Sequence, residues 1–90
     1  MNEKNGQSIR RTLAALHYVM RSRYEPFRLS EFQYALEIPL STAHSYLSYL
    51  MKEGIVVQNT KTMHYRMSTS FRNMLVATGL SLVQVRKEAS

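Results

Sequence analysis

The sequence predicts a small, mainly α-helical fold with one β-hairpin: a three-helix core, the hairpin and an extra C-terminal helix. The chain has 90 residues and 44% of them are apolar, which is enough for the core of one small domain. Apolar residues recur at helical spacing as far as Leu50, and beyond Gly54 they change to the alternation typical of strands. Pro26, Pro39 and Gly54 divide the helical stretches.

The first helix is predicted to start at Ser8, a suitable N-cap, after a loose polar leader over residues 1–7. Its inner stripe has apolar residues at steps of four, three and four: Ile9, Leu13, Leu16 and Met20. Arg11 and Tyr18 fall on the opposite face of this helix. Pro26 then prevents the helix from continuing past Glu25, and Phe27–Leu29 is expected to be a short extended link.

A second, short helix is predicted from the capping-box sequence Ser30–Gln33, in which the Ser and Gln side chains can each bond to the other's backbone N–H. Leu29 and Tyr34 can form the hydrophobic staple that accompanies such a box. The residues expected to be buried are Phe32, Ala35 and Leu36. Pro39 forbids further continuation of this helix.

The third helix is predicted to begin with Ser41 as its N-cap. Its inner face has residues three and four apart: Ala43, Tyr46, Leu47 and Leu50. Gly54 fits the left-handed position just after the helix. Two helices separated by three or four residues give the layout of a helix-turn-helix.

The segment after Gly54 predicts a β-hairpin. Ile55–Gln58 is β-branched, Asn59–Thr62 is a polar tip, and Met63–Met67 alternates apolar with polar residues. The inner face of the hairpin is expected to carry Met63, Tyr65 and Met67.

The C-terminal part, residues 69–90, is interpreted as a further helix and a possible dimerisation element. A helical stripe there contains Phe71, Leu75, Thr78, Leu82 and Val85. A glycine inside a helix costs about 1 kcal/mol relative to alanine, so Gly79 makes a continuous helix less favourable. The alternative is a helix that ends near Thr78, followed by an extended segment over Leu80–Val85. The stripe over residues 71–85 is either packed within the chain or the interface of a homodimer.

The charge favours a polyanionic partner. Twelve Lys and Arg residues outnumber six Glu residues, for a formal charge of +6. The middle of the chain, residues 29–54, has one basic and three acidic residues, whereas the two flanks are both basic. Nucleic acid is therefore a better candidate partner than a membrane.

The composition argues against several other classes of protein. The chain has no cysteine, so it offers no disulfide or thiolate metal site. It has no aspartate, no glycine-rich phosphate loop and no nucleophile beside a base, and we therefore expect neither an enzyme nor a cofactor. His17, His44 and His64 lack the spacing of zinc ligands, so no metal is expected. The absence of a signal peptide or a long apolar stretch predicts a soluble cytoplasmic protein.

The order of elements over residues 8–68 resembles a winged helix-turn-helix DNA-binding domain, and it is most similar to IclR-type and, more loosely, MarR-like transcriptional regulators. The similarity rests on four pieces in the correct order: Ile38–His44, Tyr46–Leu50, Glu53–Val56 and Tyr65–Met67. The first piece matches the family's turn proline and the Ser-Thr pair that opens the recognition helix. The other three match, in order, the buried leucines of that helix, the glycine before the wing and the returning strand of the wing. The resemblance does not extend to the effector domain of the family, so we expect no effector sensing from these residues.

The sequence departs from the family pattern at three positions. Leu40 stands where a basic residue usually precedes the Ser-Thr pair, and Ser45 stands where an Arg often follows the His. Both are positions from which such proteins reach DNA. Glu37 replaces the usual turn glycine, and it must therefore either adopt a left-handed conformation or change the turn.

The resemblance implies sequence-specific binding of double-stranded DNA, with the recognition helix 41–53 in the major groove and the wing 58–63 on the flanking backbone or minor groove. The exposed face of that helix offers small polar groups but no Arg, Asn or Gln for bidentate base contacts. Cations on the first helix and the wing are suited to phosphate. The predicted DNA-binding residues are Ser41, Thr42, His44, Ser45, Ser48, Tyr49, Lys52, Lys61, Arg66, Arg10 and Arg11.

The function predicted from the sequence is that of a small bacterial, phage or plasmid transcriptional regulator that acts as a homodimer. Two alternative hypotheses remain. The weakly basic recognition helix also suits a winged-helix module that binds protein, such as an anti-repressor or adaptor, through Tyr46, Tyr49 and Met51. A non-specific architectural DNA binder is the other alternative. The sequence leaves open the operator, the effector and the choice between repression and activation.

Overall fold

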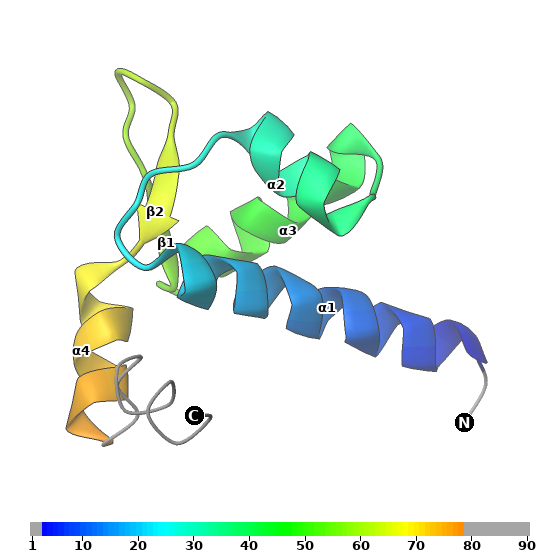
Figure 1. The fold of residues 1–90 in the computed structure, drawn as a ribbon, viewed down its shortest axis with the longest axis horizontal. Helices are drawn as coiled ribbons and strands as arrows, with labels where there is room; N and C mark the ends of the chain where they lie inside the picture. Colours follow the sequence, from blue (N-terminus) through cyan, green and yellow to red (C-terminus); the bar gives the residue numbers. More distant parts are fainter. Residues whose placement is uncertain (1–2, 79–90) are drawn as a thin grey trace.

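A computed structural model describes residues 3–78, with side chains from Gly6 onward (Figure 1). Four helices and a two-stranded hairpin follow one another, as the sequence predicts. The elements are α1 (Glu3–Ser22), α2 (Leu29–Leu36), α3 (Leu40–Lys52), β1 (Val56–Gln58), β2 (Tyr65–Met67) and α4 (Thr69–Ala77). In this part of the chain, no helix has both the length and the apolar character that crossing a bilayer requires.

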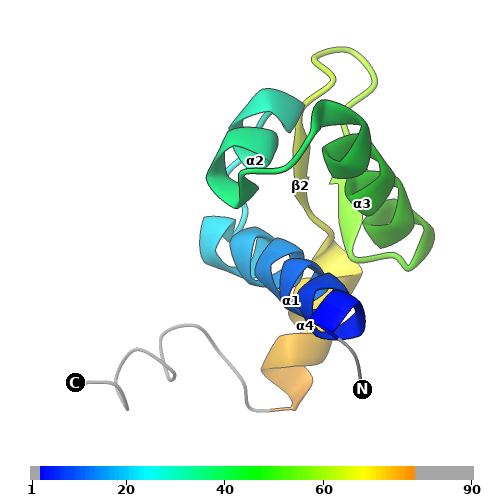
Figure 2. The same ribbon diagram turned by 90° about the vertical axis from the view of Figure 1, so that its right-hand side faces the viewer.

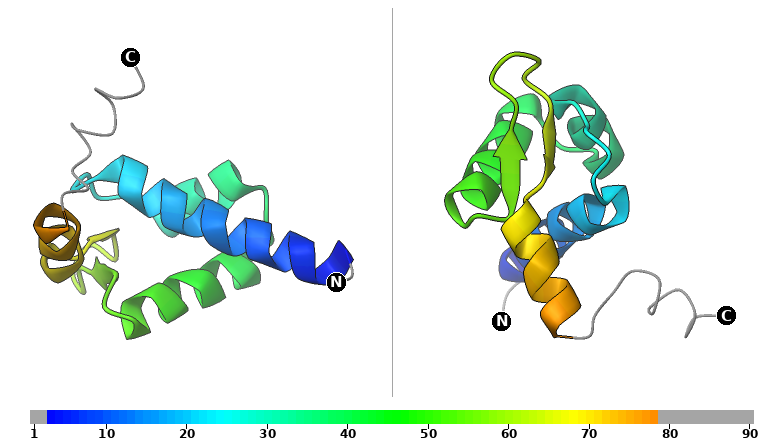
Figure 3. Two further views of the ribbon diagram at one scale, coloured as in Figure 1. Left: turned by 90° about the horizontal axis from the view of Figure 1, so that it is seen from below. Right: turned by 90° about the vertical axis from the view of Figure 1, so that its left-hand side faces the viewer.

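The helices form two levels with the hairpin at one end. The long α1 passes under α2 and α3, which lie side by side above it (Figure 2). The hairpin stands beside these helices with its tip pointing away from α1, and α4 descends from the base of the hairpin in the opposite direction (Figures 1 and 3). The core lies where α1, α2, α3 and the hairpin meet.

The structure corrects the predicted start and inner face of α1. The helix begins at Glu3, so Ser8 is not its cap and most of the predicted leader is helical. Ala15 and Val19 face the core, whereas Ile9 and Leu13 of the predicted stripe are 50% and 59% exposed. Spacing alone could not decide this, because the helix has two apolar stripes and periodicity does not tell which one meets a partner.

Helix α2 starts two residues earlier than a capping box at Ser30 requires. Arg28 is the N-cap, and its backbone N–H donates to the Glu31 carboxylate over 2.8 Å. Phe32 is fully buried and Leu36 partly so, as predicted, but Ala35 and Tyr34 are exposed, so the staple with Leu29 does not form. The acidic side chain three residues after the cap therefore takes the role assigned to Gln33.

The turn between α2 and α3 places a non-glycine residue in the left-handed region. Glu37 has φ 53° and ψ 50°, the first of the two outcomes expected from the missing glycine. Pro39 is the N-cap of α3, so the prediction of Ser41 as the cap was wrong. The fixed φ of proline, here −61°, suits the start of a helix and explains the earlier beginning.

The inner face of α3 is confirmed. Ala43 and Leu47 are fully buried, and Tyr46 and Leu50 pack against the core. Gly54 follows the helix with φ 76°, and Ile55 N–H donates to the Leu50 carbonyl over 2.8 Å, the closing bond of a left-handed helix end.

The hairpin is antiparallel, with Val57 opposite Arg66 and Gln58 opposite Tyr65. Tyr65 and Met67 are buried as predicted. Met63 is not on the inner face: it lies in the turn with φ 66° and an exposed side chain. The turn is therefore longer than the polar residues at its centre suggest, and strand pairing resumes only at Tyr65.

The hairpin is attached to the helices through Phe27. The backbone N–H groups of Phe27 and Tyr65 each donate to the other's carbonyl over 2.8 Å. The Phe27 ring stacks on Tyr65 and on Phe32, with centroids 6.0 Å apart in each case, and the Tyr18 ring meets Phe27 and Phe32 edge-on at 5.1 and 5.3 Å. Tyr18 thus faces the core, contrary to the prediction from periodicity.

Ser68 joins the hairpin to α4. Its hydroxyl accepts from Phe71 N–H over 3.1 Å as the N-cap and donates to the Gly54 carbonyl over 2.6 Å. The helix ends at Ala77, which agrees with the alternative of a helix ending near Thr78. Leu82, Val85 and the predicted extended segment Leu80–Val85 lie outside the described residues.

We expect Glu37→Gly to stabilise the fold, because glycine adopts the left-handed conformation without steric cost. The gain should be about 1 kcal/mol, or roughly 4–8 °C in the melting temperature of a domain this small. Thermal unfolding followed by circular dichroism measures it. Glu37→Ala is the control, because it removes the charge and keeps the Cβ; an equal gain in both variants would contradict the conformational explanation.

We also expect Tyr18 to make stability depend on alkaline pH. Burial, and secondarily the negative charge of Glu31, raise the pKa of Tyr18 above its ordinary value of 10.0. The unfolded chain therefore ionises first, so the free energy of unfolding falls as the pH rises above about 10. Urea unfolding at a series of pH values should show a shallower fall for Tyr18→Phe. An equally steep fall in Tyr18→Phe and in the wild type would contradict the assignment to Tyr18.

Candidate nucleic-acid interface

The outward side of α3 gathers most of the predicted DNA-binding residues. Ala43 and Leu47 anchor the opposite side in the core, and this fixes which residues face outward. Ser41, His44, Ser45, Tyr49 and Lys52 are exposed, whereas Thr42 and Ser48 are partly buried. From Ser41 to Lys52 the helix therefore presents a polar surface, here called the α3 face.

Five of these residues line one shallow hollow: His44, Ser45, Ser48, Tyr49 and Lys52. They are brought together because positions four apart lie one above the other on a helix. Tyr49 stands out from the surface with 69% of its side chain exposed. The hollow offers hydroxyl, imidazole and phenol groups that can both donate and accept hydrogen bonds, and its only permanent charge is that of Lys52.

The first turn of α3 is free to contact a ligand. Because Pro39 rather than Ser41 caps the helix, the Ser41 hydroxyl is not used for capping. Ser41 and Thr42 lie near the unpaired backbone N–H groups at the helix start, where a phosphate oxygen is favoured.

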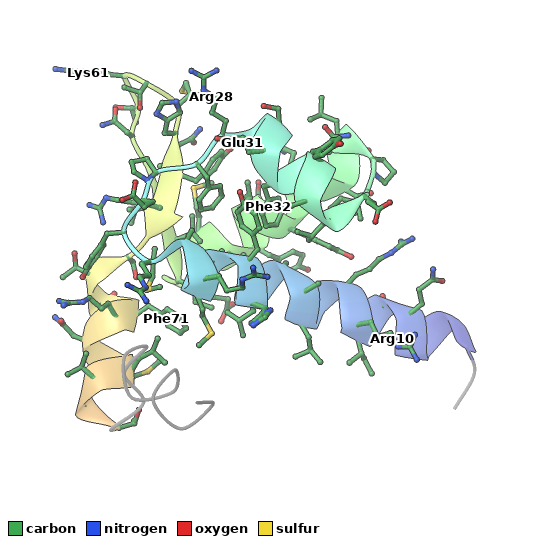
Figure 4. The ribbon with its side chains drawn as sticks, viewed as in Figure 1. Arg10, Arg28, Glu31, Phe32, Lys61 and Phe71 are labelled. Atoms are coloured by element: carbon green, nitrogen blue, oxygen red, sulfur yellow. The ribbon has the colours of Figure 1, made fainter. Side chains whose placement is uncertain are left out.

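The hairpin tip is held in one conformation by hydrogen bonds from a single residue. The Asn59 side-chain oxygen accepts from the N–H groups of Lys61 and Thr62 over 2.8 and 3.0 Å. Its backbone pairs with His64 and Met63 over 2.8 and 2.7 Å. Lys61 lies at the far end of the hairpin and its side chain is exposed (Figure 4).

Arg66 lies lower on the hairpin than Lys61. It is exposed opposite Val57 on the outer face of the two strands, and its guanidinium donates to the Met67 carbonyl over 3.0 Å. With Pro26 and Gln58 it lines a second hollow on that outer face.

The structure does not bring the α1 cations to the hairpin tip. Arg10 lies near the N-terminal end of α1, at the end of the molecule remote from Lys61 (Figure 4). Arg11 is the next residue of the same exposed stretch.

Sequence reasoning missed Arg28, which the structure places beside the hairpin. Its Nε–H donates to Nε2 of His64 over 3.2 Å, across 36 positions of sequence. Arg28, Leu29, Ser30, Leu40, Thr62, Met63 and His64 line a groove, here called the wing groove, between the starts of α2 and α3 and the hairpin. The available signal was Glu31, three residues after Arg28, at the spacing of an alternative capping box. Because the cap was predicted at Ser30, Arg28 was assigned to the extended link.

Comparisons with known proteins identify the family. The model of the IclR helix-turn-helix domain matches residues 8–60. No curated protein matches the chain. Among solved structures, the fold is similar to the crystal structure of Pseudomonas aeruginosa HmgR, with a TM-score of 0.67 and 24% identity. This alignment covers 79% of the present chain and 29% of HmgR. The chain belongs to the IclR helix-turn-helix family of DNA-binding domains, which act in transcription regulation.

Proposed function

We propose that this chain is a small transcriptional regulator, of bacterial, phage or plasmid origin, that recognises a specific sequence in double-stranded DNA through α3. The observation that carries the proposal is the α3 face, where a hollow of small polar groups and Tyr49 lies on a helix whose other side is anchored in the core. A helix anchored on one side and polar on the other fits the width of the major groove.

The proposed recognition relies on many modest contacts. The α3 face has no Arg, Asn or Gln, so it lacks the bidentate pairs that discriminate guanine or adenine most strongly. Ser45, Ser48 and His44 can bond base edges directly or through water, and the Tyr49 ring can pack on a thymine methyl group. Ser41 and Thr42 are assigned to phosphate at the start of the helix.

The proposed backbone contacts come from the wing. We assign Lys61, at the exposed tip, to a minor groove or its phosphates, and Arg66 to a phosphate along the hairpin. Arg10 and Arg11 are remote from this tip, so we assign them to phosphates at the margin of the site and to long-range attraction of the duplex.

We propose that the regulator acts as a homodimer, since one winged helix covers few base pairs. The predicted seam over residues 71–85 is described only as far as Thr78. Phe71 and Leu75 of its stripe are partly buried, and Phe71 packs against the core, whereas Met74 and Val76 beside the stripe are largely exposed. Ile9 and Leu13 on α1 offer a second exposed apolar surface. Contiguous exposed apolar patches mark interaction sites, so we take these two surfaces as the candidates for the interface.

A protein-binding module is the second candidate function. The exposed tyrosines Tyr34 and Tyr49 and the scarcity of charge on the α3 face favour it, because aromatic residues are enriched and charges depleted at the centres of protein interfaces. A stable complex with a protein that survives nuclease and high salt would support this candidate over the regulator.

The proposed function predicts how the affinity for DNA depends on salt. The logarithm of the affinity for duplex DNA should fall linearly with the logarithm of the salt concentration, because bound phosphates release counterions. Lys61→Ala and Arg66→Ala should each reduce the steepness of this line by about 0.9 on every duplex tested. Fluorescence anisotropy titrations measure the slopes, and Lys61→Arg should retain the wild-type slope. A flat line for the wild-type chain would refute the proposed function.

The second prediction concerns sequence preference. Selection of bound duplexes from a random pool should recover one motif, and a dimer should recover it as an inverted or direct repeat. Tyr49→Ala should relax the preference at particular base pairs, each worth about 1–3 kcal/mol, because it removes a base contact. Tyr34→Ala is the matched control, an exposed tyrosine outside the α3 face, and should leave the motif unchanged. Recovery of random sequences by the wild type would indicate an architectural binder.

A further inference from the structure

We propose that the wing groove is a seat for one sugar–phosphate unit of a DNA strand, with Arg28 as the phosphate ligand and His64 as the residue that positions it. This inference rests on the proposed function and adds a binding site to it. The groove is formed by segments distant in the sequence: the starts of α2 and α3 and the returning side of the hairpin tip.

The location of the groove follows from the geometry of a duplex. The major and minor grooves of DNA are separated by one sugar–phosphate strand. A protein that inserts α3 into the major groove and the hairpin tip into the adjacent minor groove must straddle that strand. The wing groove is the depression between these two elements, so a backbone segment would occupy it.

The lining of the groove has the mixed chemistry that such a segment requires. Leu40 and Met63, 54% and 59% exposed, supply apolar walls that suit the carbon atoms of a deoxyribose. Arg28 supplies a permanent cation beside them. The neighbouring carboxylate of Glu31 accepts the backbone N–H of Arg28, so the acid supports the helix start while the guanidinium points to the hairpin.

His64 fixes the direction of the Arg28 guanidinium. The Nε–H of Arg28 donates to Nε2 of His64 over 3.2 Å, which uses only one of the five guanidinium donors. The two terminal nitrogens can then form the paired contacts that arginine makes with phosphate oxygens. The left-handed Met63 immediately precedes His64, so the tip conformation that exposes Met63 also places the imidazole.

Arg28 is the one permanent cation among the residues that line the wing groove. The start of α3 offers none, because Leu40 is apolar and Ser41 and Thr42 are uncharged. Leu40 and Arg28 line the same groove. We infer that Arg28 supplies from α2 the cation that this chain lacks at the start of α3.

The test uses the full chain and a duplex recovered by the selection described above. Arg28→Ala should weaken binding at least about tenfold and reduce the steepness of the salt dependence by about 0.9. Arg72→Ala is the matched control. It removes the same charge from α4, on the opposite side of the molecule from the hairpin tip, where Arg72 lies 5.0 Å from the Tyr24 ring. The control should leave the slope unchanged, and circular dichroism should show both variants folded.

A series of duplexes, each with one phosphate replaced by an uncharged methylphosphonate, identifies the contacted phosphate. At one position the wild type should lose affinity by about the same factor as Arg28→Ala, and the variant should lose nothing further there. Additive losses at every position, or a slope unaffected by Arg28→Ala, would overturn the groove proposal while the proposed function stands. Failure of the wild type to bind any duplex would overturn both.

The role of His64 is tested through its dependence on Arg28. His64→Ala should weaken binding in the wild-type background and have no further effect in the Arg28→Ala background, because a positioning residue acts only through its partner. His64→Gln, which keeps a hydrogen-bond acceptor, should restore part of the loss. Equal losses from His64→Ala in both backgrounds would mean that His64 supports the hairpin independently, and the positioning role would be excluded.

Discussion

The relation between the hairpin and the helices depends on the antiparallel pair of Phe27 and Tyr65. An isolated two-stranded hairpin is marginally stable, so this one requires a further contact. The two 2.8 Å hydrogen bonds of the pair form an isolated antiparallel bridge between the link before α2 and the hairpin, and the stacked rings continue the contact into the core through Phe32. The same link leads directly into Arg28 and α2. The hairpin and the start of α2 are therefore positioned together, and the wing groove between them is a consequence of that single attachment.

The proposed complex separates phosphate attraction from base recognition. The formal charge of +6 belongs largely to the flanks of the sequence, and the α3 face carries only Lys52 as a permanent charge. Attraction to phosphates is uniform along a duplex, so it supplies affinity without sequence information. Hydrogen bonds from small hydroxyl groups to base edges supply sequence specificity but little affinity. In the proposed complex, the hairpin and the start of α2 bind the DNA backbone, and α3 contacts the base edges. Such a division makes recognition sensitive to the exact placement of α3, and the anchoring of Ala43 and Leu47 in the core provides that placement.

The sequence predicted the order of elements, the family and the inner face of α3, because proline, glycine and a single apolar stripe define them locally. The sequence-based prediction failed where the same segment allows two local structures, such as two apolar stripes on one helix or two caps at one helix start. On α1, the stripe through Ile9 and Leu13 is as regular as the one through Ala15 and Val19, and only the aromatic cluster of the folded state selects the latter. At α2, two overlapping caps were available. The α3 face followed from helical spacing, but the wing groove could not be predicted, because Arg28 and His64 are 36 residues apart and meet only through the fold.

The closure of the hairpin tip by Asn59 also has an evolutionary consequence. All the bonds that shape the turn run between residues 58 and 64, and none of them reaches the buried cluster. Lengthening, shortening or replacing this turn would therefore leave the buried cluster intact, although it would disturb the bond between Arg28 and His64, and it would alter the surface that meets DNA in the proposed complex. Paralogues could diversify their operators by exchanging this small cassette, and a protein engineer could graft foreign turns onto the same two strands without redesigning the scaffold.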